Sequence, residues 1–264
     1  MTSIPRSRLT ENAALRLVCL PYAGGGSAVF HRWRTTLPPH VDLVPLALPG
    51  HDGRLAEPPR TDLRMLADEL AEDMRPALGR PYVLVGHSLG AWIAFELARV
   101  LRRRGLPQPE LLVVAGARPP HIDLPQSPLH LLPDKEFIAA LQARYDGIPS
   151  AILASAELLQ LLLPVLRADI QMVETYRYAD EAPLEIEFLV LGGAEDPAIS
   201  AAQLADWRRH TSRNCSVRQF PGGHFFLFRG DERQLRAGGL EPNPALETII
   251  AMLRRHIANH GDGV

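Results

Sequence analysis

The sequence predicts an α/β fold with a mostly parallel sheet flanked by helices. Short apolar runs alternate with longer segments whose apolar residues recur at helical spacing, which is typical of βα units. Most of the short runs are apolar nearly throughout, as expected for strands that are covered on both faces. With 264 residues, the chain is long enough for one large α/β domain or two small ones, and 46% hydrophobic residues support a sizeable core. Of these two, we expect residues 1–264 to form a single domain.

Six apolar runs predict the strands, and the last is polar enough for an edge strand. They are Leu15–Leu20, Asp42–Leu48, Tyr82–Gly86, Leu111–Ala115, Glu187–Leu191 and Ser216–Phe220. Four periodic segments between or after these strands predict helices. They are Asp62–Leu78, Leu89–Arg103, Ile199–His210 and Ala245–His256. The last of these has Asn243 as a candidate N-cap and Pro244 at its first position.

Composition and charge exclude several classes of partner. A net charge of −2 indicates no polyelectrolyte partner, so we expect no binding of nucleic acid. Residues 1–14 lack the apolar core of a signal peptide, and no run approaches the roughly 18 apolar residues of a membrane span. The two cysteines, Cys19 and Cys215, make no disulfide framework and favour a reducing compartment. We expect a cytoplasmic monomer with no membrane partner.

The pentapeptide Gly86-His-Ser-Leu-Gly90 stands where a predicted strand passes into a predicted helix. In that context, G-x-S-x-G is typical of the nucleophile elbow of the α/β-hydrolase fold, a sharp, strained turn that exposes a serine Oγ. Both glycines suit such a bend because a side chain would clash there. A glycine-rich turn that only closes a βα unit is the alternative. The flanking strand and helix favour the elbow, with Ser88 as nucleophile.

A helical segment without a clear strand interrupts the alternation between Ala115 and Glu187. Its periodicity predicts helices over Asp134–Tyr145, Ala151–Leu163 and Val165–Tyr178. In the strand numbering of the α/β-hydrolase fold, this is the insertion after the sixth strand, where such proteins carry a helical lid. We expect a lid subdomain over about residues 119–180, above the active site. A plain helical subdomain packed on the edge of the sheet is the alternative.

A serine nucleophile needs a base, and the base needs a group that orients it. In this fold the chain order is Ser, then Asp or Glu, then His. Asp196 follows a predicted strand, at the sheet edge where open sheets place their sites, and Pro197 restricts its backbone. Glu195 is its competitor. His224 follows the last strand and Gly222-Gly223, whereas the other histidines, His87 included, lack a matching position.

The oxyanion of the reaction needs two hydrogen-bond donors. We expect one to be the backbone N–H of Leu89, at the start of the helix after Ser88. The other is expected in the loop Leu20-Pro-Tyr-Ala-Gly-Gly-Gly-Ser27, with the N–H of Ala23 as the candidate. This glycine-rich loop is not a phosphate-binding motif, because no Gly-Lys-Ser/Thr follows it.

Further motifs accompany the elbow over most of the chain, from about Arg16 to His256. They are Leu20-Pro-Tyr-Ala-Gly-Gly25, Leu48-Pro-Gly50 followed by Arg54 and Glu57-Pro58, Leu162-Leu-Pro-Val-Leu-Arg-Ala-Asp169, Glu174-Thr-Tyr-Arg-Tyr178, Gly192-Gly-Ala-Glu-Asp-Pro197 and Gly222-Gly-His-Phe-Phe226. Together they resemble the type II thioesterases of polyketide and nonribosomal peptide synthesis. The motifs of the helical insertion count most, because they are not general to serine hydrolases.

The resemblance implies a catalytic triad of Ser88, Asp196 and His224, with the Ala23 and Leu89 amides as the oxyanion hole. It further implies hydrolysis of aberrant or stalled acyl groups from the phosphopantetheine arm of carrier proteins, without a cofactor or metal of the enzyme's own. The chain departs from the family in two places. His51-Asp52-Gly53 follows Leu48-Pro-Gly where an arginine is common, and Arg229–Glu241 is long and polar.

Two other functions remain open from the sequence. A carboxylesterase or lipase would have the same triad, although the insertion motifs argue against it. The second is a non-catalytic hydrolase fold that only docks on a synthase, and the complete triad argues against it. For an acidic carrier protein, Arg32 and Arg34 are the candidate docking residues. Arg102-Arg103-Arg104 are the weaker choice, since cations there satisfy the end of a helix.

Overall fold

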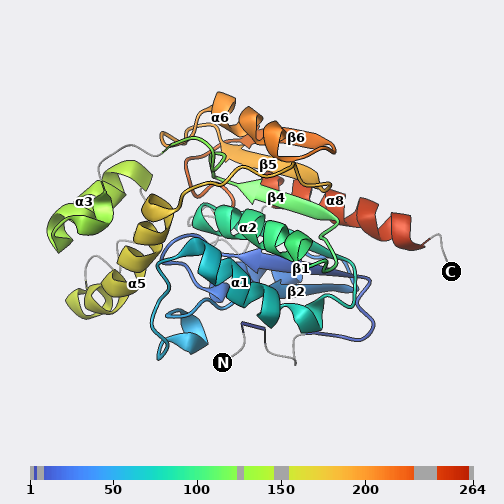
Figure 1. Ribbon diagram of the computed structural model, residues 1–264, viewed down its shortest axis with the longest axis horizontal. Coiled ribbons are helices and arrows are strands. Elements are labelled where there is room, and N and C mark those ends of the chain that lie inside the picture. Colours follow the sequence, from blue (N-terminus) through green and yellow to red (C-terminus); the bar gives the residue numbers. More distant parts are fainter. Residues whose placement is uncertain (1–2, 5–8, 124–127, 146–154, 229–242, 262–264) are drawn as a thin grey trace, which may run out of the picture.

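The computed structural model of the chain describes residues 3–4, 9–123, 128–145, 155–228 and 243–261. Six parallel strands form one sheet in the order β2-β1-β3-β4-β5-β6 (Figure 1). Their bounds are Leu15–Leu20 (β1), Val41–Pro45 (β2), Tyr82–His87 (β3), Leu111–Ala115 (β4), Glu187–Gly193 (β5) and Cys215–Phe220 (β6). All six predicted strands are present, and β6 is an edge strand as expected. The predicted run to Leu48 is shortened in β2, which ends at Pro45, a residue without an N–H for the ladder.

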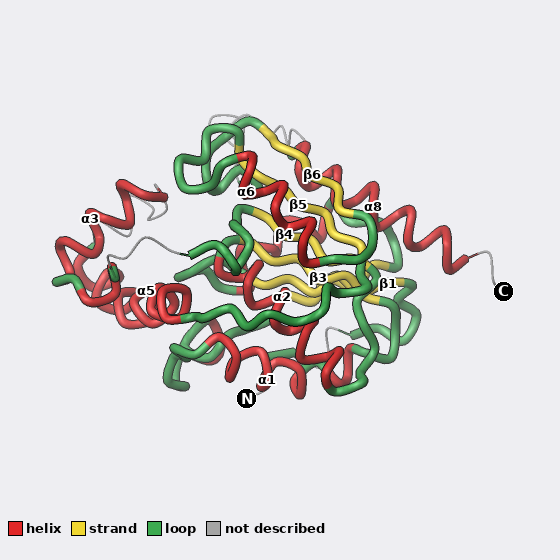
Figure 2. Tube along the Cα trace, turned by 45° about the horizontal axis from the view of Figure 1, so that its top comes forward, coloured by secondary structure: helices red, strands yellow, loops and turns green. Residues whose placement is uncertain are grey.

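Side chains from the strands enter two separate cores, one on each face of the sheet. On β3, Leu84 belongs to the first core, while its neighbours Val83 and Val85 belong to the second. Helices α1 (Leu63–Asp73) and α2 (Leu89–Arg103) cover the first face, and α8 (Pro244–Gly261) covers the second (Figures 1 and 2). Burial on both faces explains why the strands read as continuous apolar runs rather than alternating ones.

The ends of the flanking helices follow local chemistry. Asp62 caps α1, because its side chain accepts hydrogen bonds from the amides of Arg64 and Met65, both at 2.9 Å. The predicted helix to Leu78 is too long. The α-helix ends at Asp73, and a short 3₁₀ turn over Arg75–Ala77 contains Pro76, whose ring does not fit a helix interior.

Two other helix ends show the same control by capping residues. The predicted helix Ile199–His210 is α6 (Ala201–Ala205) followed by a 3₁₀ turn over Asp206–His210, with a capping box at Ser200. Asn243 is the predicted cap of α8, and its Oδ1 accepts from the amide of Ala245 at 2.9 Å.

Between β4 and β5, helices α3 (Asp134–Tyr145) and α5 (Ala156–Thr175) lie side by side beyond one end of the sheet (Figure 1). They share a small core of their own, built on Phe137, Leu141, Leu163, Leu166 and Ile170. The prediction of α3 is confirmed. Residues 151–154 of the next predicted helix lie outside the described residues, as does the polar segment Arg229–Glu241.

The two helices predicted over Ala151–Leu163 and Val165–Tyr178 are wrong as separate elements. Helix α5 runs without a break through Pro164. Pro164 lies on the exposed side of the helix, while Leu163 and Leu166 on either side of it are buried. Packing on the buried side therefore outweighs the lost hydrogen bond at the proline. Within the described residues, no helix is both long and apolar enough to cross a membrane.

Candidate active site

The strand order places a site at the carboxyl ends of the central strands β1 and β3. After β2 the chain crosses β1 and continues in β3, so the loops after β1 and β3 leave the sheet on opposite sides. Ligands of open α/β sheets bind at such a switch point, beyond the carboxyl ends of the strands. The loop Leu20–Ser27 follows β1 and Ser88 follows β3, and both therefore reach the same place.

Ser88 occupies a strained turn between β3 and α2. Its φ of 55° and ψ of −116° are unusual for a residue with a side chain. The turn needs glycine on both sides. A Cβ on Gly86 would lie 2.1 Å from the carbonyl oxygen of Gly90, and a Cβ on Gly90 would lie 2.2 Å from that of Leu20. This geometry confirms the predicted elbow.

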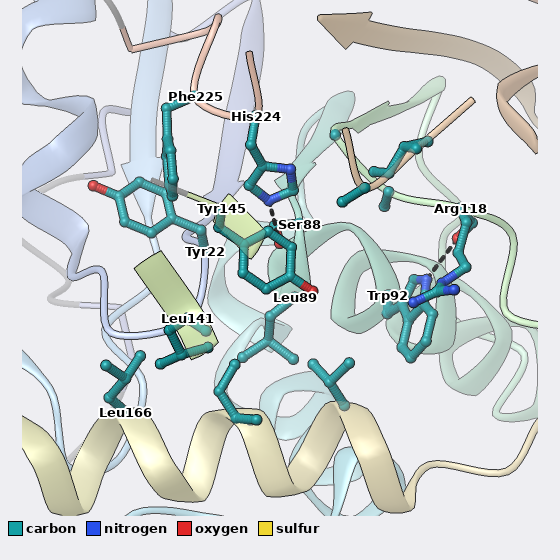
Figure 3. Close-up of a pocket in the computed structure, with 17 residues that line it drawn as sticks. Tyr22, Ser88, Leu89, Trp92, Arg118, Leu141, Tyr145, Leu166, His224 and Phe225 are labelled. Atoms are coloured by element: carbon teal, nitrogen blue, oxygen red, sulfur yellow. Dashed lines mark hydrogen bonds between the residues drawn. The ribbon is translucent and has the colours of Figure 1, made fainter. Parts of the chain in front are cut away.

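His224 and Asp196 join Ser88 in one hydrogen-bonded chain. The Nε2 of His224 lies 3.0 Å from the Oγ of Ser88 (Figure 3). The Nδ1 of His224 lies 2.8 Å from the Oδ2 of Asp196. A carboxylate only accepts hydrogen bonds, so Nδ1 carries the hydrogen and Nε2 is free to accept the serine proton. The imidazole is therefore in the tautomer that a general base requires.

The structure separates the roles of the two adjacent carboxylates. The side chain of Asp196 is almost fully buried, and its Oδ1 also accepts from the amide of Ala198 at 2.9 Å. Glu195 instead accepts a hydrogen bond from the backbone amide of Gly222, in the turn that leads to His224. Glu195 thus stabilises the turn that precedes His224, while Asp196 contacts the ring of His224. This arrangement agrees with the preference for Asp196.

His87 is next to Ser88 but does not contact its hydroxyl in the described structure. Its ring is fully buried and packs edge-on against Tyr22 and Phe228, with ring centres 5.9 and 5.1 Å apart. Burial, with a smaller contribution from the charge of His224, lowers the pKa of His87 well below its ordinary value. A neutral aromatic ring in this place supports the turn from inside the protein, as expected from its place beside the nucleophile.

The two amides predicted for the oxyanion belong to Ala23, in the loop after β1, and Leu89, the first residue of α2. Both residues line the pocket that contains Ser88. Among the described residues, neither amide hydrogen has a hydrogen-bond acceptor. An N–H without an internal acceptor at a helix start is a ready donor to an oxyanion.

The pocket around Ser88 is largely apolar, and the helices after β4 supply one wall of it (Figure 3). Leu141 and Tyr145 come from α3, while Leu166 and Ile170 come from α5. The ring of Tyr145 lies 4.7 Å from that of His224, and burial raises the pKa of its hydroxyl. The helical segment therefore reaches His224 and the pocket that contains Ser88.

The sequence did not point to Arg118 or Tyr145. Arg118 lies on the same pocket wall, after the carboxyl end of β4, and burial lowers the pKa of its guanidinium. The rule that selected Asp196 and His224, a polar residue just past a strand end, would have found Arg118 too. Tyr145 had no comparable signal, because it reaches the site from the end of a helix.

Fold and site define a serine hydrolase of the α/β-hydrolase class. The thioesterase domain family matches residues 15–237 of the chain. The chain belongs to this family.

Individual relatives agree over nearly the whole length. The gramicidin S biosynthesis protein GrsT of Aneurinibacillus migulanus is 39% identical over 84% of this chain and 86% of its own. The structure is similar to the RedJ thioesterase from the prodiginine pathway of Streptomyces coelicolor, with a TM-score of 0.81, 35% identity, and coverage of 90% of this chain and 85% of that one. It is also similar to YbtT, a type II thioesterase from the yersiniabactin NRPS/PKS pathway, with a TM-score of 0.77, 30% identity, and coverage of 97% and 98%.

Proposed function

We propose that the protein hydrolyses acyl thioesters from the phosphopantetheine arm of carrier proteins in nonribosomal peptide or polyketide synthesis. We propose that the protein clears stalled or aberrant acyl groups from these carriers. The Ser88–His224–Asp196 chain beside an apolar pocket carries the proposal, because it supplies an activated nucleophile where an acyl chain would bind. Membership of the thioesterase family and the similarity to YbtT support a thioester on a synthase as the substrate.

In the first step, Ser88 Oγ attacks the thioester carbonyl carbon, and its proton passes to Nε2 of His224. The negative charge on the carbonyl oxygen is stabilised by the amides of Ala23 and Leu89. Asp196 stabilises the imidazolium that forms, through Nδ1. The carbon–sulfur bond then breaks, and the imidazolium returns its proton to the leaving pantetheine sulfur. The acyl group is left as an ester on Ser88.

In the second step, water takes the place of the serine. His224 removes a proton from the water as its oxygen attacks the acyl-serine carbon, and the same two amides stabilise the oxyanion. The bond to Ser88 Oγ breaks, and His224 returns the proton to that oxygen. The products are a free carboxylic acid and the carrier thiol. No step needs a cofactor or a metal held by the enzyme.

The helical segment between β4 and β5 acts in this proposal as the lid, within about residues 119–180. Leu141, Leu166 and Ile170 would contact the acyl chain, and Tyr145 would keep bulk water from the reacting carbonyl. This segment follows β4, the fourth strand of the described sheet.

We propose that an acidic carrier protein docks near Arg32 and Arg34. Both side chains are exposed on a 3₁₀ segment, Ser27–Thr35, directly after the loop that carries Ala23. The alternative arginines at the end of α2 are already engaged. Arg102 and Arg103 pair with Glu181 at 2.8 and 2.7 Å, and Arg104 pairs with carboxylates on α1.

Replacing Ser88 with alanine tests the proposal. Wild-type protein is expected to release the acyl group from an octanoyl-carrier protein, whereas Ser88→Ala is expected to lose at least about 10⁴-fold in kcat. Intact-protein mass spectrometry of the carrier measures the release. Hydrolysis by Ser88→Ala at the wild-type rate would rule out Ser88 as the nucleophile.

A comparison of substrates tests the same-class alternative. We expect kcat/KM to be higher for the octanoyl thioester of a carrier protein than for an octanoyl ester of a simple alcohol. A preference for the simple ester would identify a carboxylesterase instead. Failure of a fluorophosphonate to label Ser88 would favour a docking protein without catalytic activity.

A further inference from the structure

One carboxylate connects the lid helix to the loop that carries the oxyanion donor. Asp169 lies on α5, and only 1% of its surface is exposed. Its Oδ2 accepts a hydrogen bond from the backbone amide of Gly24 at 2.7 Å and lies 2.9 Å from Nε2 of His51. A carboxylate buried to this degree is costly unless its hydrogen bonds are satisfied, so these two partners hold it in place.

The contact acts on the residue next to the predicted oxyanion donor. Gly24 follows Ala23 directly and has a left-handed φ of 74°. Helix α5 also packs against it, since a Cβ on Gly24 would lie 2.9 Å from the side chain of Leu166. At its other end, the same loop is held by Asp52, whose carboxylate accepts from the amide of Ser27. Carboxylates from two different segments thus hold the loop at Gly24 and at Ser27.

His51 faces Asp169 as a cation. Its Nδ1 lies 3.1 Å from the carbonyl oxygen of Pro49, and its Nε2 faces the Asp169 carboxylate. Both partners only accept hydrogen bonds, so both ring nitrogens carry a hydrogen. Burial alone would lower the pKa of His51. The hydrogen bond and charge of Asp169, with smaller contributions from Pro49 and Asp52, outweigh burial and raise it.

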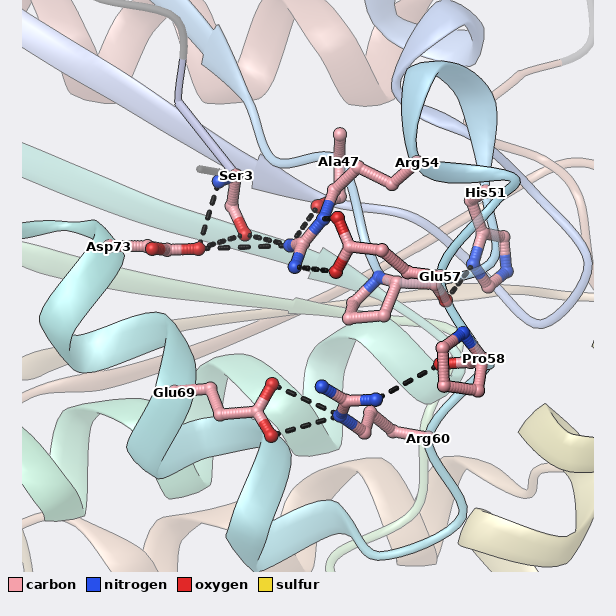
Figure 4. Close-up of polar contacts among 10 residues, drawn as sticks. Ser3, Ala47, His51, Arg54, Glu57, Pro58, Arg60, Glu69 and Asp73 are labelled. Carbon is pink, nitrogen blue, oxygen red and sulfur yellow. Dashed lines mark hydrogen bonds and ion pairs between the residues drawn. The ribbon is translucent and has the colours of Figure 1, made fainter. Parts of the chain in front are cut away.

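The segment that carries His51 is itself anchored (Figure 4). The buried guanidinium of Arg54 donates to both carboxylate oxygens of Glu57, at 2.9 and 2.6 Å, and to the Ser3 hydroxyl at 2.7 Å. The carbonyl of Arg54 accepts from the amide of Gly50. These contacts fix the turn in which His51 lies, and they therefore fix the position of the His51 ring beside Asp169.

We propose that Asp169 is a positioning residue that couples helix α5 of the lid to the loop Leu20–Ser27, here called the oxyanion loop. His51 is its counterion. The pair holds the Gly24 amide, and through it the N–H of Ala23, where the oxyanion forms. When α5 packs against the oxyanion loop, the N–H of Ala23 is aligned with the position of the oxyanion. This inference rests on the proposed function, because it requires that Ser88 is the nucleophile and that an oxyanion forms.

Asp169→Ala tests the proposal, with Glu174→Ala as a matched control on the same helix. Glu174 has the same type of partners, because it accepts from the amides of Leu129 and His130 and pairs with the His130 ring, away from the oxyanion loop. Alanine is a good helix former, so neither change weakens α5 by propensity. Steady-state kinetics on the N-acetylcysteamine thioester of octanoic acid avoid carrier docking. An octyl trifluoromethyl ketone, which forms an oxyanion with a serine, probes the hole directly.

We expect Asp169→Ala to lower kcat by about 10–100-fold with little change in KM, because the lost contribution arises only in the transition state. Binding of the ketone should weaken by a similar factor. Asp169→Asn keeps one oxygen acceptor and should recover part of the loss. Glu174→Ala should stay within about twofold of wild type for both readouts.

Equal losses in Asp169→Ala and Glu174→Ala would overturn the proposal, as would a fall in kcat without weaker binding of the ketone. Failure of the proposed function gives a different result. If wild type hydrolyses no thioester, that function is wrong, while the rates of fluorophosphonate labelling of the two variants still test Asp169. An Asp169→Ala rate equal to that of Glu174→Ala would then overturn the coupling.

Discussion

Backbone geometry around a single residue, Ser88, carries much of the chemistry. Its left-handed φ of 55° turns the side chain out of β3, while its own amide donates to the carbonyl of Ala115 at 2.8 Å on β4. The strained conformation persists because α2 passes so close to β1 that only glycine fits at position 90. The hydroxyl of Ser88 is thus oriented by packing between backbones rather than by side-chain contacts alone.

Gly90→Ala is therefore expected to destabilise the protein and to impair catalysis. The added methyl group would meet backbone oxygens of Leu20 and Pro21, which cannot move like the end of a side chain. We expect a loss of about 1–3 kcal/mol or more in the free energy of unfolding, measured by chemical denaturation. Gly79→Ala is the control, because nothing lies within 4 Å of a Cβ there. Equal stability of the two variants would contradict the close approach of α2 to β1.

His51 is expected to make stability depend on pH. Because its pKa is raised above the ordinary 6.5, the His51–Asp169 pair contributes fully below that value and is lost as pH rises through the raised pKa. His51→Gln keeps a donor toward Asp169 without the charge. The excess in Tm of wild type over His51→Gln should therefore shrink from about pH 5.5 to about pH 9. The exposed His31→Gln is the control, and a constant excess across this range would refute the charged pair.

At the scale of elements, α5 shows how tertiary packing overrides a local signal. Pro164 predicts a break, and the helix continues because its opposite side is buried against α3 and the loop after β1. The helix is also the element that contributes most to the candidate site beyond the triad. Leu166 and Ile170 line the pocket, and Asp169 lies between them on the buried side. An irregular helix at this place would misplace all three side chains.

Pro164→Ala should stabilise α5 locally, because it restores a backbone donor on an exposed position of the helix. We expect about 1–2 kcal/mol, seen as amide hydrogen exchange in α5 that is slower by about 5–30-fold. Leu161→Ala, at another exposed position of α5, is the control and should leave the exchange rates nearly unchanged. Unchanged exchange in Pro164→Ala would show that the proline costs this helix nothing.

Over the whole molecule, the sequence predicts the features that follow a periodic pattern and the polar residues that directly follow a strand. The alternating apolar runs predict all six strands, and the strand-end rule predicts Asp196 and His224, which the structure brings to Ser88. What the sequence cannot supply is the pairing of distant segments. Asp169 contacts Gly24 across 145 positions of the chain, and nothing local at either residue signals the other. The role of Tyr145 is hidden for the same reason.

The central claim is that Ser88 accepts the acyl group from a carrier thioester before water releases it. Rapid quenching of wild-type protein with octanoyl-carrier protein, followed by peptide mass spectrometry, measures this most directly. We predict a transient octanoyl ester on the peptide that contains Ser88, absent in Ser88→Ala, with the carrier thiol released in equal amount. Release of octanoic acid at the wild-type rate without an acyl-serine at position 88 would contradict the mechanism.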